Sequence, residues 1–155
     1  MKSLAPLLLL ALALCGCGKK APFHEEYAVL IREARTPTER LIHTLDYRLM
    51  CYAEKNELEQ HLVLSNGVDQ FEAWMLTKIF ISEHVGACFD LEPPVMIRGK
   101  WTVRNRLGRA LSEGPPILVD AISGQIACEG HPTIEDPIGF LTRYRLKLEA
   151  PKKLN

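Results

Sequence analysis

The chain has 155 residues, and its 19 Lys and Arg side chains are balanced by 19 Asp and Glu side chains. A chain of this length forms one domain large enough to bury a core of its own. Nucleic-acid binding requires concentrated positive charge, so the balanced composition argues against a nucleic-acid partner.

The first 16 residues are predicted to be a secretory signal. A positive charge at Lys2 precedes a run from Leu7 to Leu14 that consists almost entirely of Leu and Ala. A signal peptide has this order of charge, apolar run and small-residue junction. A membrane-spanning helix needs about 20 consecutive apolar residues, so this run is too short to be one.

The junction Leu14-Cys15-Gly16-Cys17 resembles the lipobox of bacterial lipoproteins. The resemblance implies cleavage after residue 16 and a lipid on Cys17. Residues 17–24 would then be a lipidated tether, and residues 25–150 a single domain anchored in the cell envelope and facing the periplasm. Gly18 favours the outer membrane if the sorting rule of enteric bacteria applies. The alternative is a cleaved signal peptide with two incidental cysteines.

Residues 25–85 are predicted to be helical. A first short helix is indicated by apolar side chains at helical spacing, namely Tyr27, Leu30, Ile31 and Ala34. Thr36-Pro37-Thr38-Glu39 supplies an N-cap, a proline at the first helical position and the glutamate of a capping box, and polar residues 54–57 mark the end of this second helix.

A third helix follows the turn residues Ser65-Asn66-Gly67 and is expected to end at Gly86. Its large apolar residues are Phe71, Trp74, Met75, Ile79 and Phe80. They cover much of the circumference, which predicts that this helix packs most deeply against the sheet. Core packing is favoured over a ligand cavity for Trp74 and Met75.

Residues 94–132 are predicted to form a sheet of two consecutive hairpins. Gly99 and Gly124 lie at the turns, each between short runs rich in β-branched and aromatic residues. Asp120 is expected to accept hydrogen bonds from the backbone of its own turn. The segment from Thr142 to Leu148 alternates polar and apolar side chains, which predicts a final strand, although Asp136-Pro137 before it is able to cap a helix.

Three cysteines remain after the signal: Cys51, Cys88 and Cys128. In an oxidising compartment one disulfide is plausible, with three possible pairings and one thiol left over. We favour Cys88 with Cys128, because both flank elements of the predicted sheet. Three buried free thiols are the alternative.

Residues for catalysis or metal binding form no recognised motif. The five histidines lack metal-ligand spacing, and neither a nucleophile elbow nor a phosphate-binding loop is present, so we expect no cofactor and no enzymatic activity. Glu129, His131 and Asp136 are close enough in sequence to form a general-base site. The competing interpretation is a turn in which Asp136 caps or bends the chain before Pro137.

The order of elements resembles the immunity proteins of the nuclear transport factor 2 fold. The resemblance covers residues 69–132 and is carried by Ala73 to Phe80, Pro94, Trp101-Thr102-Val103, Gly114, Ile117 to Asp120 and Gly124-Gln125-Ile126. It implies a cone-like α+β domain in which N-terminal helices pack on a curved antiparallel sheet. It also implies that the protein neutralises a toxin or hydrolase by stoichiometric binding.

Further readings remain open. The segment Val119 to Ile126 also looks like the hairpin of PepSY-type domains, which are thought to bind or inhibit peptidases. An enzyme of the envelope ranks third, and no residue excludes a purely structural envelope lipoprotein. For an inhibitor, hot spots are expected in a patch rich in aromatic or Arg residues. Arg104, Arg106 and Arg109 are the clustered candidates, and a solvated basic loop is the alternative.

Overall fold

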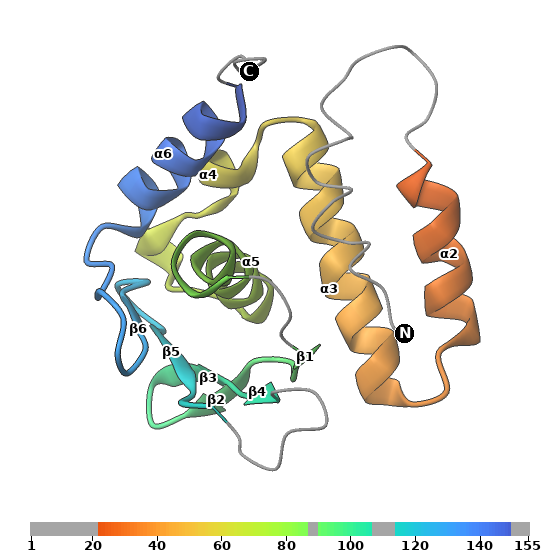
Figure 1. Ribbon diagram of the computed structural model, residues 1–155, viewed down its shortest axis with the longest axis horizontal. Coiled ribbons are helices and arrows are strands. Elements are labelled where there is room, and N and C mark those ends of the chain that lie inside the picture. Colours follow the sequence, from red (N-terminus) through yellow and green to blue (C-terminus); the bar gives the residue numbers. More distant parts are fainter. Residues whose placement is uncertain (1–21, 87–89, 107–113, 150–155) are drawn as a thin grey trace.

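The computed structural model of the protein describes residues 22–86, 90–106 and 114–149. The expected signal, the lipobox cysteine Cys17 and most of the tether lie outside these residues. The α+β class is confirmed, with helices gathered on one side of an antiparallel sheet (Figure 1). No helix in the described segments is both long and apolar enough to cross a membrane.

The helices are α2 (Phe23–Glu33), α3 (Pro37–Glu54), the short α4 (Leu58–His61), α5 (Gln70–Phe80) and α6 (Pro137–Glu149), with a 3-10 turn η1 (Leu64–Asn66) and a π-helical turn η2 (Ile81–Val85) that continues α5. Three of the helices, α2, α3 and α5, correspond to the three helices predicted from the sequence. Helix α2 therefore begins slightly before the expected Glu25, and α4 was not predicted.

The strands form two sheets. They are β1 (Asp90–Leu91), β2 (Val95–Ile97), β3 (Lys100–Val103), β4 (Asn105–Arg106), β5 (Ile117–Asp120) and β6 (Ile126–Ala127). The main sheet has the order β2-β3-β5-β6 and is antiparallel throughout, while β1 and β4 pair separately. The two predicted hairpins are thus confirmed, and the β1-β4 pair is an addition.

The predicted start of α3 is confirmed by its cap, although the Glu39 carboxylate accepts from the N–H of Arg35, over 2.8 Å, rather than completing a capping box with Thr36. The Thr36 hydroxyl accepts a hydrogen bond from the backbone N–H of Glu39 over 3.1 Å, with Pro37 at the first position of α3. Asp69 begins α5 with a complete capping box, since its carboxylate accepts from the N–H of Glu72 and the Glu72 carboxylate accepts from the N–H of Asp69, each over 2.7 Å. These bonds satisfy backbone donors that a helix leaves free at its first turn.

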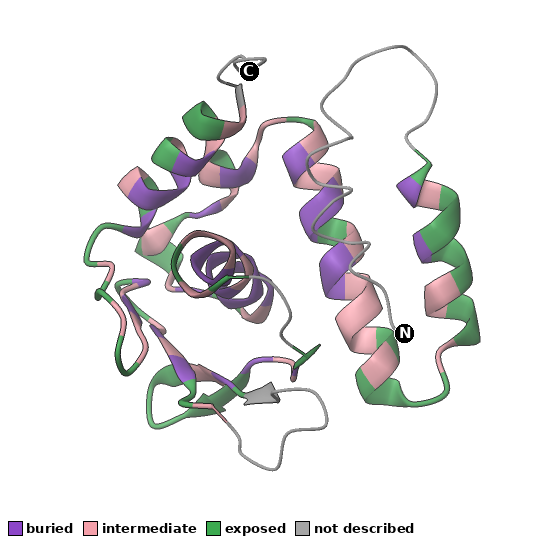
Figure 2. Ribbon diagram, in the orientation of Figure 1, coloured by how far each residue is buried: buried purple, intermediate pink, exposed green. Residues whose placement is uncertain are grey.

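Helix α5 is the centre of the core, as its apolar circumference predicts. Almost every residue from Phe71 to Phe80 is buried, and Trp74 and Met75 are core residues (Figure 2). One face of α5 packs on β3, β5 and β6, and the others meet α3 and α6. Because α5 contacts the sheet as well as α3 and α6, these elements are positioned relative to one another through α5.

Both predicted turn glycines have the left-handed backbone that a tight turn requires. Gly99 has φ 77° beside Arg98 at φ 51°, and Gly124 has φ 71°. Two consecutive positive φ angles between paired residues Ile97 and Lys100 are typical of a two-residue type I′ turn, whose twist matches that of the strands.

The predicted C-terminal strand is wrong, because residues 142–148 lie within helix α6. Asp136 accepts a hydrogen bond from the N–H of Gly139 over 2.9 Å, so the Asp136-Pro137 pair starts the helix. The helix buries Phe140, Leu141 and Tyr144 at helical spacing. Leu146, which a strand would have placed on the same face as Tyr144, is exposed.

Helix α2 is attached to the rest of the domain by a small cluster of its own. The cluster is separate from the main core and consists of Phe23, Tyr27, Met50, Leu30, Tyr47 and Cys51. His24 lies at the edge of this cluster. Its Nδ1 is 3.2 Å from the Tyr47 hydroxyl, and its Nε2 is 3.4 Å from the Glu54 carboxylate. Helix α2 thus packs chiefly on α3.

Candidate binding surface

The main sheet has an inner and an outer face, because successive side chains of a strand point to opposite sides. Its inner face carries buried side chains such as Val103, Val119 and Ile126 and packs on α5. The register places a second set on the opposite side, which we call the outer face: Val95, Ile97, Lys100, Thr102, Leu118, Asp120 and Ala127. All of these are half-buried or exposed.

The outer face is apolar where it is most exposed. In strand β2, at one edge of the sheet, Val95 is 58% exposed and Ile97 is 44% exposed. Ile122, in the turn between β5 and β6, is 78% exposed. Single exposed apolar residues are common, but several on one sheet face and its adjoining turn are typical of an interaction surface.

Ile122 lies at the same end of the sheet as the β2-β3 turn. The backbone N–H of Ala121 donates to the carbonyl oxygen of Gly99 over 3.1 Å, so the two hairpin turns are joined there. Lys100 and Asp120 are cross-strand partners beside this junction. Apolar Ile97 and Ile122 therefore flank a pair of opposite charges at one tip of the sheet.

The turn that carries Ile122 is held in one conformation by Asp120. The Asp120 carboxylate accepts hydrogen bonds from the backbone N–H groups of Ile122 and Ser123, over 3.0 and 2.9 Å, and from the Ser123 hydroxyl. The backbone bonds from Ser123 and then Ile122 lower the pKa of the Asp120 carboxyl. The predicted turn role of Asp120 is confirmed, and its carboxylate is committed to structure.

The same tip is tied to the segment before α5. The carbonyl oxygen of Ala121 accepts from the N–H of Val68 over 2.7 Å, and the indole N–H of Trp101 donates to the carbonyl oxygen of Val68 over 2.6 Å. Gly67 makes this approach possible, because a Cβ on it would lie 2.9 Å from the Ala121 oxygen. The exposed residues of the tip are thus presented by a rigid support.

The structure tests the predicted arginine cluster only at its first member. Arg104 follows β3 and is exposed, and its carbonyl oxygen accepts from the N–H of Glu92 over 3.0 Å. Arg106 belongs to β4, but its side chain and the whole of Arg109 lie outside the described atoms. A partner-binding role for these three arginines stays a prediction.

The predicted disulfide also stays a prediction, because Cys88 lies outside the described residues. Cys128 follows β6 with a partly buried side chain, and Cys51 is a free thiol within the α2-α3 cluster. Burial, and secondarily the charge of Glu129, raises the pKa of the Cys128 thiol. A raised pKa makes this thiol a poor nucleophile at neutral pH.

Glu129, His131 and Asp136 have separate surroundings. Asp136 caps α6, the His131 ring lies edge-on to Phe80 with centroids 6.1 Å apart, and Glu129 is exposed. The turn interpretation of Asp136 is therefore supported by its contacts. Among the described residues, no three His, Cys, Asp or Glu side chains are arranged to hold a metal ion.

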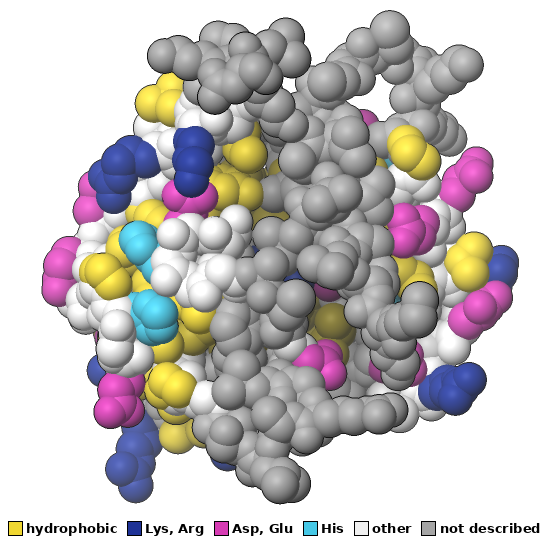
Figure 3. All heavy atoms as spheres, viewed as in Figure 1, with side chains coloured by type: hydrophobic (Ala, Val, Ile, Leu, Met, Phe, Trp, Pro, Cys, Tyr) yellow, Lys and Arg dark blue, Asp and Glu magenta, His cyan; other side chains and the backbone are white. Residues whose placement is uncertain are grey.

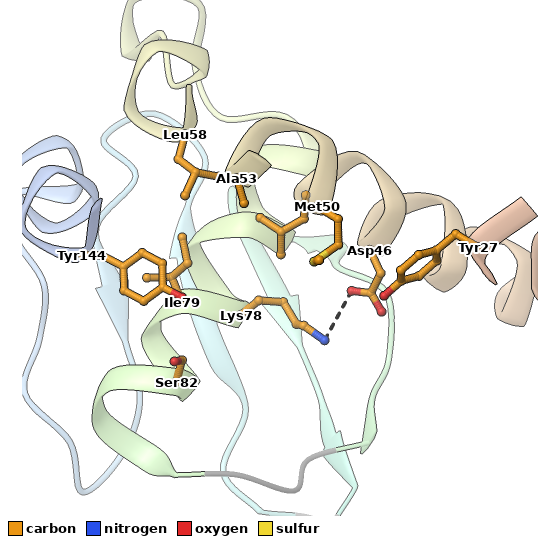
Figure 4. Close-up of a pocket in the computed structure, with 10 residues that line it drawn as sticks. Tyr27, Asp46, Met50, Ala53, Leu58, Lys78, Ile79, Ser82 and Tyr144 are labelled. Atoms are coloured by element: carbon orange, nitrogen blue, oxygen red, sulfur yellow. Dashed lines mark ion pairs between the residues drawn. The ribbon is translucent and has the colours of Figure 1, made fainter. Parts of the chain in front are cut away.

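A buried polar cluster joins α3 to α5 and was missed in the sequence. Asp46 accepts a hydrogen bond from the Trp74 indole N–H over 2.9 Å and forms an ion pair with Lys78, whose Nζ is 3.3 Å away (Figure 4). The Lys78 ammonium also lies 5.3 Å from the centre of the Trp74 ring. In the sequence, the signal for this cluster is the acidic residue Asp46, which lies beside Leu45 on an apolar helix face.

The narrow pocket around this cluster is lined mostly by apolar side chains. Its polar groups include Asp46, Lys78, Ser82 and the hydroxyls of Tyr27 and Tyr144 (Figure 4). Burial raises the pKa of Tyr144 to about 12. Burial, followed by the charge of Asp46, raises the pKa of Tyr27 further. Both phenols thus stay protonated at neutral pH, and Asp46 is already paired, which is typical of a structural joint between helices.

The charges on the described part of the face drawn in Figure 3 do not favour a partner of one sign. Figure 3 shows Lys and Arg side chains interspersed with Asp and Glu around the described part of the visible face. Two of the ion pairs fix α6 to its neighbours, with Arg145 bonded to Glu59 over 3.0 Å and Lys147 to Glu83 over 2.9 Å. These charged side chains serve the fold.

Comparison of the chain with models of protein families, with curated proteins and with solved structures gives no significant match. The resemblances to lipoproteins and to immunity proteins of the nuclear transport factor 2 fold therefore rest on the sequence motifs alone.

Proposed function

We propose that this protein is a lipid-anchored, periplasm-facing immunity protein that neutralises a secreted toxin or hydrolase by stoichiometric binding. The proposed contact surface is the outer face of the sheet together with Ile122. The observation that carries the proposal is the exposure of Val95, Ile97 and Ile122 on a rigid sheet whose other face is filled by α5.

The exposed area is large enough to matter for affinity. Burying one large aliphatic side chain contributes about 1.5–3 kcal/mol. Covering roughly half of each of three such side chains would contribute on the order of 3 kcal/mol, or about a hundredfold in affinity. Rigid presentation adds to this, because little conformational entropy remains to be lost on binding.

Binding of this kind requires no catalytic group on the inhibitor. The described acidic side chains with shifted pKa values, such as Asp120 and Glu59, owe those shifts to hydrogen bonds that hold the fold together. The lipid on Cys17 would keep the protein at the surface where a toxin delivered into the envelope arrives.

The test compares three baits recovered from the native cell envelope: the wild type, Ile122→Asp, and the matched control Val29→Asp. Val29 is an exposed aliphatic residue on α2, away from the sheet. We expect one protein in equimolar amount with the wild type and the control, and its loss with Ile122→Asp. The purified partner should form a one-to-one complex and lose its toxic or hydrolytic activity.

Recovery of the same partner in equal amount with all three baits would exclude Ile122 from the contact surface. An equimolar partner whose activity is unaffected by the complex would exclude neutralisation. The anchor is tested separately, because Cys17→Ser should release the protein into the soluble periplasmic fraction, and unchanged membrane retention would contradict lipidation.

A further inference from the structure

Strand β2 is an open edge of the main sheet. Its partner is β3 on one side, and on its other side no strand of the described segments pairs with it. Open edges of apolar strands are usually blocked by charged residues, prolines or bulges, because they otherwise pair with further strands. The three residues Val95, Met96 and Ile97 carry no charge, and all are exposed.

The hydrogen-bond pattern shows which backbone groups face outward on this edge. In an antiparallel pair, residues alternate between bonding one neighbour and facing away from it. The two-residue turn at Arg98-Gly99 makes Ile97 and Lys100 a bonded pair, so Val95 and Thr102 are the next bonded pair. Met96 lies between them, and its N–H and C=O therefore point away from β3.

The opposite side of β3 supports this assignment. The Ala121 N–H bonds to the Gly99 carbonyl oxygen, so Gly99, and by alternation Trp101, directs its backbone groups toward β5. Lys100 and Thr102 must then direct theirs toward β2. Met96 alone in β2 directs both backbone groups outward at the edge, and neither group is bonded to a described residue.

We infer that β2 pairs antiparallel with β2 of a second copy of the chain, with Met96 on the two-fold axis. In this arrangement the N–H and C=O of each Met96 bond the C=O and N–H of the other, which satisfies both free groups. Val95 of each copy lies opposite Ile97 of the other. The two four-stranded sheets become one sheet of eight strands.

Several features favour a second copy as the occupant. The strand is self-complementary, since reversal about Met96 exchanges two aliphatic residues, and a two-fold interface requires such self-complementarity. The same reversal places Arg98 opposite Pro94, so the two Arg98 residues are about four residue steps, roughly 13 Å, apart. Like charges at that separation are largely screened at physiological salt.

The contact is short, with three residue pairs, and is expected to be weak in dilute solution. Interfaces below about 1,200 Å² are typical of transient complexes. Outer-face side chains stay accessible, because strand addition uses the edge and not the face. The inference is therefore independent of the proposed toxin partner.

Sedimentation equilibrium of the purified full-length protein over a range of concentrations tests the inference. The wild type should show a reversible monomer-dimer equilibrium. Met96→Lys should shift it to monomer, because like charges would face each other at the axis. Leu146→Lys, which adds the same charge at an exposed position on α6, should leave the equilibrium unchanged. Circular dichroism verifies that both variants remain folded.

A second measurement locates the contact. In a background with serine at the native cysteines, Met96→Cys should be joined rapidly between two copies by a short bifunctional maleimide. Ile122→Cys should react slowly although Ile122 is more exposed. Two sheets joined at β2 separate these residues by five strand spacings, which is at least about 24 Å. The inference would be overturned if the wild type stays monomeric, or if the dimer survives Met96→Lys or is lost in Leu146→Lys. Equal cross-linking at both positions would also overturn it.

Discussion

The Asp46 joint between α3 and α5 makes the sharpest prediction about stability. Asp46→Ala removes the acceptor of the Trp74 indole N–H and the counter-ion of Lys78 at once. A hydrogen bond to a charged group contributes about 1.5–3 kcal/mol, and breaking a buried ion pair from one side costs about 3–5 kcal/mol. Lys78 is 19% exposed, so its ammonium reaches some water, and we expect a net loss of about 3 kcal/mol.

Three further variants separate the contributions. Asp46→Asn keeps an oxygen for Trp74 but removes the counter-ion of Lys78, so it should cost less than Asp46→Ala and more than the control below. Adding Lys78→Met to Asp46→Ala should recover part of the loss, because no unpaired charge then remains buried. Lys147→Ala is the control, since Lys147 also forms an ion pair but is 67% exposed, and its loss should cost less than about 1 kcal/mol.

Urea unfolding followed by far-ultraviolet circular dichroism gives the free energy of unfolding of each variant. A loss of 3 kcal/mol is a large fraction of the roughly 5–15 kcal/mol that stabilises a typical domain. If Asp46→Ala costs no more than Lys147→Ala, the joint does not stabilise the fold and the reasoning fails. If the double variant is no more stable than Asp46→Ala, the unpaired lysine is not the cause of the loss.

Three other predictions concern backbone strain and pH. Gly67→Ala should destabilise the protein by about 1–3 kcal/mol in urea unfolding, and by more than Gly86→Ala. Both glycines have positive φ with ψ near 180°, but only Gly67 approaches the Ala121 oxygen. Equal losses of stability would contradict this contact. The lowered pKa of Asp120 contributes stability that is present above about pH 4 and is lost as the pH falls through the pKa of the folded state. The difference in stability between the wild type and Asp120→Asn at pH 7 should therefore shrink near pH 3. A difference that stays constant with pH would refute this role of the Asp120 carboxylate. The pKa of Tyr144, raised to about 12, implies that stability falls as the pH rises from about 10 to 12, and Tyr144→Phe should lose less over this range in unfolding titrations.

The sequence predicted those parts of the fold that depend on neighbouring residues. The start of α3 follows from Thr36-Pro37, and the two hairpins follow from glycines at turns between β-forming runs. Helix α6 was misassigned because Tyr144, Leu146 and Leu148 alternate as in a strand, while the signal that outweighs this pattern is the cap at Asp136. The β1-β4 pair was missed because two-residue strands carry no periodicity.

The candidate surface was predicted only in part. The strand at Val95 to Ile97 was expected, but its apolar residues read like those of a buried strand, and only the strand order shows that β2 lies at an open edge. The contact of Asp46 with Trp74 links residues 28 positions apart, which no local pattern reports. Position in the sheet and long-range pairing are tertiary properties, so they had to come from the structure.

The separate cluster beneath α2 has a mechanical consequence. Any pull transmitted along the chain from residues before Pro22 enters the domain at Phe23, the first residue of α2. Helix α2 packs chiefly on α3, through a few side chains that are distinct from the main core. Tension would therefore act on this cluster first. Helix α2 would separate from α3 and lengthen the segment that connects α3 to the preceding chain, while α5 and the sheet it supports keep their shape.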